Sequence, residues 1–241
     1  MMKKITYIFT IRLLLMSSFF FFLSSSFAQT QPQRQPGKKV MKKDLEEKEK
    51  TPLYNGVTIG VDAYGIGAKF FGSDFLSSEV SVDVNLKHRF FPVLELGYGT
   101  TDTTNDDGIH YKSFAPFARI GMNYNTMYKK KSDSYLYVGL RYGFTAFKYD
   151  VSAPDINDGI WPGDIPFNYT GEKSNAQWLE LVVGVRAQVF KSFHMGWSLR
   201  YRNRLSVKEN PNTDAWYIPG FGTNKKTILG VTYNLIYKLP F

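Results

Sequence analysis

The sequence predicts an all-β protein, an eight-stranded antiparallel up-and-down transmembrane β-barrel. Apolar and polar residues alternate with a period of two along eight segments, and this period is that of a strand with two unlike faces. Glycine and charge collect on one of these faces, and the last segment keeps an apolar row up to its terminal residue, Phe241. A barrel in lipid produces this pattern because one face contacts hydrocarbon and the other a narrow lumen.

The eight expected strands cover residues 54–65, 78–89, 92–101, 112–125, 134–149, 175–190, 193–205 and 228–241. In each of these segments, most of the residues at alternate positions are apolar or aromatic. Nine glycines fall on the opposite face: Gly60, Gly97, Gly99, Gly121, Gly139, Gly143, Gly184, Gly196 and Gly230. Inside a small, strongly curved barrel, glycine makes room beside long side chains. A soluble lipocalin-like barrel would have the opposite arrangement, with apolar residues inside and charge outside.

The face that carries the glycines also carries thirteen charged residues. These are Asp62, Glu79, Asp83, Lys87, Glu95, Arg119, Arg141, Glu180, Arg186, Arg200, Arg202, Arg204 and Lys238. Because isolated buried charge is very costly, they are expected to pair. An eight-stranded barrel is only wide enough for side chains, so the sequence predicts a lumen plugged by Arg–carboxylate pairs. An anion site on Arg200, Arg202 and Arg204 is the alternative.

The last segment resembles the C-terminal signal of bacterial outer-membrane β-barrels, which ends in Phe with aromatic or apolar residues at alternate positions. The residues that carry the resemblance are Tyr233, Leu235, Tyr237, Leu239 and Phe241. It implies that they form a membrane-insertion signal, read by the barrel-assembly machinery during biogenesis. It also implies that the protein lies in the cell outer membrane, in contact with its lipid and lipopolysaccharide.

The first 53 residues are expected to stand apart from the barrel at 54–241. Lys3 and Lys4, the apolar stretch 13–23 and Ala28 predict a signal peptide over residues 1–28. A single transmembrane helix is the alternative, but the apolar stretch is shorter than the roughly 20 residues that a span needs. Residues 29–53 are too charged to form a core and predict a disordered periplasmic tether. Adhesion of the tether to anionic headgroups or peptidoglycan is the other hypothesis.

Composition excludes several functions. With no Cys there is no disulfide framework, lipoprotein anchor or thiolate chemistry. The formal charge of +9 comes mainly from the leader and the tether, because residues 54–241 hold 20 basic and 17 acidic side chains. A nearly balanced body does not indicate nucleic-acid binding. No nucleotide-binding loop, nucleophile elbow or metal-spaced histidine pair is present.

The connections between the expected strands alternate in length. Those at 88–92, 126–133 and 191–192 are shorter, and those at 66–77, 102–111, 150–174 and 206–225 are longer. Outer-membrane barrels have short periplasmic turns and long external loops, so both termini are expected in the periplasm. Residues 105–108 and 155–159 are rich in Asn, Asp and Gly, which favours plain turns over Ca²⁺ ligation. In the longest loop, Trp161 either packs over the barrel mouth or offers a docking point to a partner.

One candidate for catalysis stands in these loops. His110 lies near Asp102 and Ser113, and two known outer-membrane barrel enzymes that act on lipid A, a deacylase and a palmitoyltransferase, use His with Ser near the outer rim. A His and a Ser three positions apart are a weak signal. The prediction is therefore a protein that is not an enzyme, with no catalytic residue, metal or cofactor.

Two stretches, Tyr54-Asn55-Gly56-Val57 and residues 85–95 (NLKHRFFPVLE), resemble an uncharacterised family of Gram-negative outer-membrane proteins, a domain of unknown function. The resemblance implies a fold and a location and no activity. The function expected is a small, non-catalytic outer-membrane barrel with a structural, envelope-integrity or surface-interaction role. The alternatives are a lipid A-modifying enzyme, a narrow channel or a ligand-binding barrel.

Overall fold

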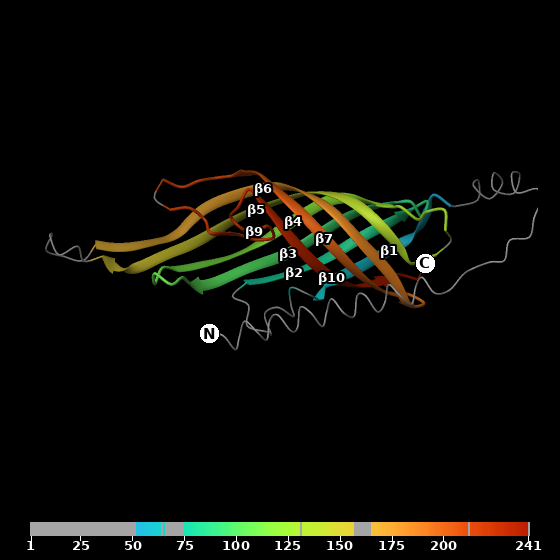
Figure 1. Ribbon diagram of the computed structural model, residues 1–241, viewed down its shortest axis with the longest axis horizontal. Helices are drawn as coiled ribbons and strands as arrows, with labels where there is room; N and C mark the ends of the chain where they lie inside the picture. Colours follow the sequence, from blue (N-terminus) through green and yellow to red (C-terminus); the bar gives the residue numbers. More distant parts are fainter. Residues whose placement is uncertain are drawn as a thin grey trace, which may run out of the picture. The chain divides into compact units, whose positions relative to one another are not determined.

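The computed structural model describes residues 52–63, 65, 75–130, 132–156, 165–211 and 213–240. Eight of its strands form a closed antiparallel ring in the order β1-β10-β7-β6-β5-β4-β3-β2 (Figure 1). They are β1 (Tyr54–Asp62), β2 (Phe75–Leu86), β3 (Phe90–Thr104), β4 (His110–Asn125), β5 (Tyr135–Ile156), β6 (Ile165–Phe190), β7 (Phe193–Val207) and β10 (Thr227–Lys238). The predicted eight-stranded up-and-down barrel is confirmed. The expected signal peptide, nearly all of the expected tether, Trp161 and Phe241 lie outside the described residues.

The predicted division between the two faces of the strands is also confirmed. Leu235, Val183 and Val82 point outward and are 36%, 50% and 39% exposed, whereas Arg186 and Arg200 are buried inside the ring. The two faces alternate along β3 and β4 without interruption over most of their length. The ring closes where β1 pairs with β10, from Thr58 opposite Lys238 to Asp62 opposite Asn234.

Two of the expected external loops are shorter than predicted, and a third contains strands. β3 and β4 stay paired as far as Thr104 and His110, so only residues 105–109 connect them. β5 and β6 stay paired as far as Ile156 and Ile165, well inside the segment 150–174 that was expected to be a loop. Polar and turn-forming residues in these segments suggested loops, but a two-stranded ribbon satisfies its backbone hydrogen bonds without an apolar face. The connection at 208–226 contains two further short strands, β8 (Tyr217–Ile218) and β9 (Gly222–Thr223).

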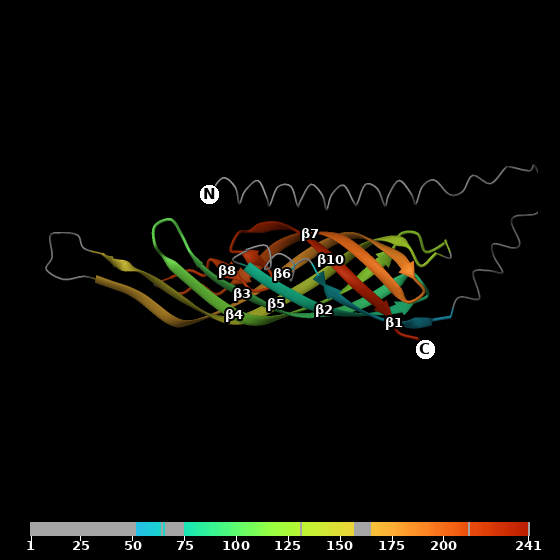
Figure 2. The ribbon, with the colours of Figure 1, turned by 90° about the horizontal axis from the view of Figure 1, so that it is seen from below.

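The two ends of the barrel differ. The connections β2–β3, β4–β5 and β6–β7 lie at the end where β1 begins and where the chain ends, whereas the β5–β6 hairpin projects from the opposite end (Figures 1 and 2). β5 has 22 residues and β6 has 26, against 12 for β2 and 12 for β10. The barrel therefore has a short-turn end and a hairpin end. Within the described residues, no helix has the length and apolar content of a membrane span.

Close packing of glycine against aromatic rings inside the barrel gives one testable consequence. A Cβ added at Gly143 would overlap the indole of Trp178, which is fully buried. We expect Gly143→Ala to lower the free energy of unfolding by about 1–3 kcal/mol, as overpacking does elsewhere. Gly196→Ala is the control, because the nearest atom to its Cβ would be the flexible end of the Ile236 side chain, at 3.2 Å, and the other neighbours lie at ordinary contact distances of 3.5 and 3.9 Å. Urea unfolding in detergent micelles, followed by tryptophan fluorescence, measures both; equal stability of the two variants would contradict the packing argument.

Candidate functional site: the barrel lumen

The lumen is filled by three layers of side chains. An ionic layer lies in the middle, an aromatic cluster closes the short-turn end, and a larger aromatic cluster fills the hairpin end. Each layer draws its members from several strands, because inward-facing residues at one height in a tilted barrel come from different positions in each strand.

The ionic layer joins three carboxylates to four guanidinium groups. Its members are Glu79, Glu95, Arg119, Arg141, Glu180, Arg200 and Arg202, from strands β2 to β7. All three carboxylates are at least 95% buried. Carboxylates with this burial persist in an apolar protein interior only when charged partners and hydrogen bonds compensate their lost hydration.

Glu95 accepts hydrogen bonds from three arginines of the ionic layer. Arg200 Nη1 donates to its Oε2 at 2.8 Å, Arg141 Nε donates to its Oε1 at 3.1 Å, and Arg119 Nη1 donates to Oε2 at 3.2 Å. Arg119 also pairs with Glu79, and its Nε lies 2.8 Å from Glu180 Oε1. Arg200 crosses the lumen to Glu79 Oε1 at 2.9 Å. The network therefore ties strands that are not neighbours in the ring.

A second ion pair lies closer to the short-turn end. Arg186 Nη2 donates to Asp83 Oδ2 at 2.6 Å, and its guanidinium lies over the rings of Phe91 and Tyr135. These two rings are stacked on each other at a centroid distance of 5.2 Å, and His88 meets both of them edge-on. This end of the lumen is thus closed by rings and one buried ion pair.

Four residues of the sequence-predicted charge network belong neither to the ionic layer nor to the Arg186–Asp83 pair. Lys87 is exposed in the β2–β3 turn with a positive φ of 53°, so its assignment to the lumen is wrong. Lys238 is half-buried at the short-turn end, where Nζ lies 3.6 Å from Asp133 Oδ2, so it also falls outside. Arg204 donates to the side chain of Asn224 in the β7–β10 connection. Asp62 accepts the backbone N–H of Tyr233 at 3.3 Å. Period-two counting placed Lys87 and Lys238 inside because it took no account of where the strands end.

The connection between β7 and β10 folds into the lumen, and sequence reasoning missed this. β8 and β9 form a small hairpin whose turn residues, Pro219, Gly220 and Phe221, are buried. Gly220 takes a φ of 80° and leaves no room for a Cβ against the ring of Phe117. Arg119 Nη2 donates to the Gly220 carbonyl at 2.7 Å, and Arg202 Nη1 donates to the Phe221 carbonyl at 2.8 Å. The hairpin therefore caps the ionic layer.

Aromatic residues of the barrel wall hold this inward hairpin. Tyr111 donates its hydroxyl to the Tyr217 carbonyl at 3.0 Å, and Tyr149 donates to the Thr213 carbonyl at 2.7 Å. Trp178 packs against Phe221 and donates its Nε1 to Glu180 Oε1 at 2.7 Å. The signal available in the sequence was the apolar stretch from Ala215 to Phe221, inside a segment that was expected to be an external loop.

The structure separates the residues considered for catalysis. His110 lies on the outward row of β4, where Nε2 is 3.4 Å from Asp102 Oδ1 and Nδ1 is 3.1 Å from Thr104 Oγ1. Ser113 lies on the inward row and is buried. The two side chains are on opposite faces of the sheet, because positions three apart in a strand point to opposite faces. Within the described ranges, no cluster of His, Cys, Asp or Glu is arranged to hold a metal ion.

The turn at residues 105–109 is a hydrogen-bonded Asx turn. Asn105 Oδ1 accepts the backbone N–H groups of Asp107, at 3.1 Å, and Ile109, at 2.8 Å. Its side-chain oxygen is therefore engaged by the backbone, which is the ordinary role of Asn in turns. Of the other Asp-rich segment, 155–159, residues 157–159 lie outside the described residues.

Known proteins resemble this chain in fold and in family. The chain is similar to the crystal structure of Neisserial surface protein A (NspA), with 15% identity, a TM-score of 0.44, and coverage of 77% of this chain and 99% of that chain. No curated protein matches the chain. Residues 7–241 match the family described as "Domain of unknown function (DUF6048)", which confirms the resemblance to a family of unknown function. The chain belongs to the DUF6048 family.

Proposed function

We propose that this protein is an integral barrel of the bacterial outer membrane, with a sealed lumen and a structural, envelope-integrity or surface-interaction role. The observation that carries the proposal is the outward apolar belt. Leu140, Leu181 and Val183, on neighbouring strands, are 58%, 49% and 50% exposed, while the ionic layer lies inside. A belt that runs around the ring far exceeds the isolated apolar patches that soluble proteins expose. Hydrocarbon is the solvent in which this arrangement is stable.

Aromatic residues at the two edges of the belt support a membrane position. Near the short-turn end, Arg89 lies over the rings of Phe90, Tyr124 and Tyr128. Toward the hairpin end, Tyr98 and Phe114 are stacked on the outer face at 5.5 Å. Aromatic girdles of this kind sit at the two membrane–water interfaces of a β-barrel. The short-turn end and both termini are assigned to the periplasm, because barrels of this class place their short turns there.

The filled lumen argues against a channel, and the separated His110 and Ser113 argue against a lipid A-modifying enzyme. In this orientation the hairpin end is the part of the protein that is exposed at the cell surface. A membrane strand needs about 9–11 residues, so more than ten residues of both β5 and β6 extend beyond the membrane. A barrel that anchors a long two-stranded ribbon fits a surface-interaction role.

The proposal predicts a membrane protein that does not conduct. Cell fractionation should place the protein in the outer membrane, and its gel mobility should change on heating, as that of folded barrels does. In planar bilayers the purified protein should give no discrete conductance steps, with a general porin as the positive control. A soluble periplasmic product would contradict the membrane assignment. Regular openings would contradict the sealed lumen.

A further inference from the structure

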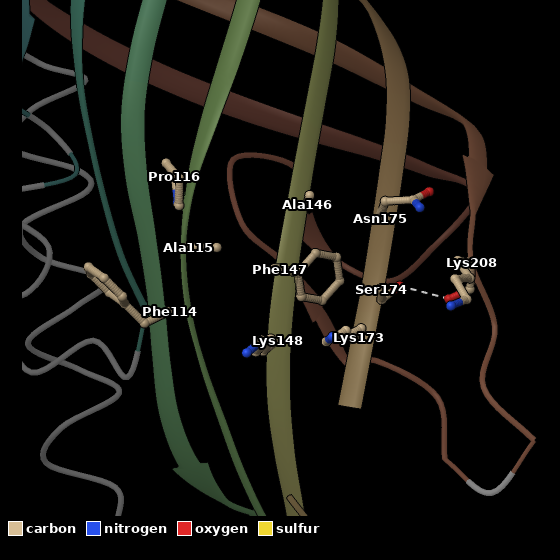
Figure 3. Close-up of a pocket in the computed structure, with 10 residues that line it drawn as sticks. All are labelled: Phe114, Ala115, Pro116, Ala146, Phe147, Lys148, Lys173, Ser174, Asn175 and Lys208. Carbon is tan, nitrogen blue, oxygen red and sulfur yellow. Dashed lines mark hydrogen bonds between the residues drawn. The ribbon is translucent and has the colours of Figure 1, made fainter. Parts of the chain in front are cut away.

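A hollow of about 440 Å³ opens on the wall of the barrel toward the hairpin end, among β4, β5, β6 and the residue that follows β7 (Figure 3). Its rim carries three lysines, Lys148, Lys173 and Lys208, and its apolar wall includes Phe114, Pro116 and Ala146. We name it the rim hollow. We propose that the rim hollow binds the phosphate-bearing headgroup of an outer-leaflet lipid, a phosphorylated glycolipid of the lipid A type. This inference rests on the outer-membrane location proposed above.

Proline creates the space between the strands. β4 and β5 are paired from Phe117 opposite Thr145 and again from Ser113 opposite Tyr149, but not in between. Pro116 lies in this gap and has no N–H to donate to a neighbouring strand. Thr145 Oγ1 donates to the Pro116 carbonyl at 2.8 Å instead. The strands separate where the backbone pairing stops, and the rim hollow lies at that separation.

The lysines of the rim hollow form a concentrated positive charge. Lys148 and Lys173 are directly opposite each other in the β5–β6 ladder (Figure 3), and like charges opposite each other destabilise a sheet. Lys208 is held beside them because Ser174 Oγ donates to its carbonyl at 2.7 Å and its own N–H donates to the Asn175 carbonyl at 2.9 Å. All three side chains are exposed. A bound dianion would offset the repulsion between them.

Nearby carboxylates do not neutralise these lysines. Within the described residues, no carboxylate oxygen lies within 4 Å of the three ammonium groups. Asp150, two positions beyond Lys148, accepts the backbone N–H of Gly171 at 2.7 Å. Asp102 is engaged by His110 and Lys112 on the neighbouring part of β4. Glu172 precedes Lys173 in the sequence and Glu209 follows Lys208, but neither glutamate is among the residues that line the rim hollow.

The height of the rim hollow matches the level of lipid headgroups. Lys148 is twelve residues beyond Leu136, the first outward apolar residue of β5. At about 3.3 Å per residue and a strand tilt of about 40°, Lys148 stands about 30 Å above Leu136, just past an apolar band about 25 Å tall. Phe114, which stacks on Tyr98 at the hairpin-end edge of the apolar belt, lines the same hollow. The lysines therefore lie at the level of the lipid phosphate groups. The apolar wall of the rim hollow lies at the level where the acyl chains begin.

Free inorganic phosphate would use the lysines but not the apolar wall, so the combination of the two favours a lipid. The neighbouring amide of Asn175, which also lines the rim hollow, adds a neutral hydrogen-bonding group suited to a sugar hydroxyl. Lysines near a membrane surface each contribute favourably to binding of anionic lipid. Three together predict an effect on affinity of about tenfold or more.

The test is lipid binding by the full protein refolded in detergent, with fluorescent bisphosphorylated lipid A as the probe. The triple variant Lys148→Gln, Lys173→Gln, Lys208→Gln should bind about tenfold more weakly than the natural sequence. The control, Lys129→Gln, Lys130→Gln, Lys191→Gln, removes three exposed lysines at the short-turn end and should bind unchanged. Heat-modifiable gel mobility confirms that each variant is folded.

A second comparison needs no variant. The natural protein should bind bisphosphorylated lipid A about tenfold more tightly than dephosphorylated lipid A, and millimolar inorganic phosphate should not displace it. Equal binding of the two lipids, or equal binding by the two triple variants, would overturn the proposal. Displacement of lipid A by inorganic phosphate would show that the site recognises free phosphate and not a lipid. A protein that inserts into bilayers but binds lipid A without preference refutes the rim hollow alone. A protein that does not insert refutes the outer-membrane proposal itself.

Discussion

Replacing Glu95 with glutamine is expected to lower the free energy of unfolding by about 3–5 kcal/mol, the cost of removing one partner from a buried ion pair. The substitution keeps the side chain's size and removes its charge. Arg119, Arg141 and Arg200 all bond to Glu95. Arg119 and Arg200 would keep Glu79 and Glu180 as partners, whereas Arg141 would lose the carboxylate that it contacts. Buried cations without a full set of partners cost more than the hydrogen bonds themselves contribute. Urea unfolding in detergent micelles measures the loss.

The matched control is Glu209→Gln, because Glu209 is an exposed glutamate just beyond β7 and should change stability by less than about 0.5 kcal/mol. A second variant isolates the ion pair. Glu95 is the carboxylate that Arg141 contacts, so adding Arg141→Met to Glu95→Gln should restore part of the lost stability. Additive losses in this double-mutant cycle would show that the two charges are not energetically linked. A Glu95→Gln barrel as stable as the natural one would contradict the ionic layer.

Placing arginine at the middle of the outward belt is expected to cost about 2–4 kcal/mol. Leu140 lies near the middle of the outward apolar row of β5 and is 58% exposed, so Leu140→Arg creates no overlap with other side chains. In water, a charge at such an exposed position would have little effect or would improve solubility. In a bilayer, the guanidinium must be dehydrated or must draw water and headgroups toward it. Reversible folding into phospholipid vesicles, followed by tryptophan fluorescence, measures the difference.

The control for Leu140→Arg is an arginine placed near the membrane interface instead of the middle of the bilayer. Phe190, at the end of β6 beside a short turn, is 73% exposed, and arginine near an interface costs only about 0–1 kcal/mol. Phe190→Arg should therefore be tolerated where Leu140→Arg is not. Similar small costs at both positions would mean that the belt does not meet hydrocarbon, and the membrane assignment would fail with it.

Strand pairing explains why the loops were harder to predict than the strands. Residues 150–156 and 165–174 contain Asp, Asn, Pro and Gly in a pattern typical of turns, yet all of them belong to β5 and β6. Once the neighbouring strand is in register, backbone hydrogen bonds extend the ladder with little regard to side-chain type, and bulges absorb the irregular positions. The two register shifts of this pair, at 149/151 and 153/156, lie in this part of the hairpin.

The local sequence determined which side of the wall each residue occupies. A strand turns its side chains alternately to its two faces, so Leu140 and Arg141 were separated by backbone geometry alone. Closure of the ring decided which charges meet. Glu79 and Arg200 are 121 residues apart and bond across the lumen, and only the stagger of eight tilted strands sets that distance. The inward course of residues 208–226 was decided in the same way, because a hairpin with buried Ile218 and Phe221 needs the aromatic wall that other strands bring together.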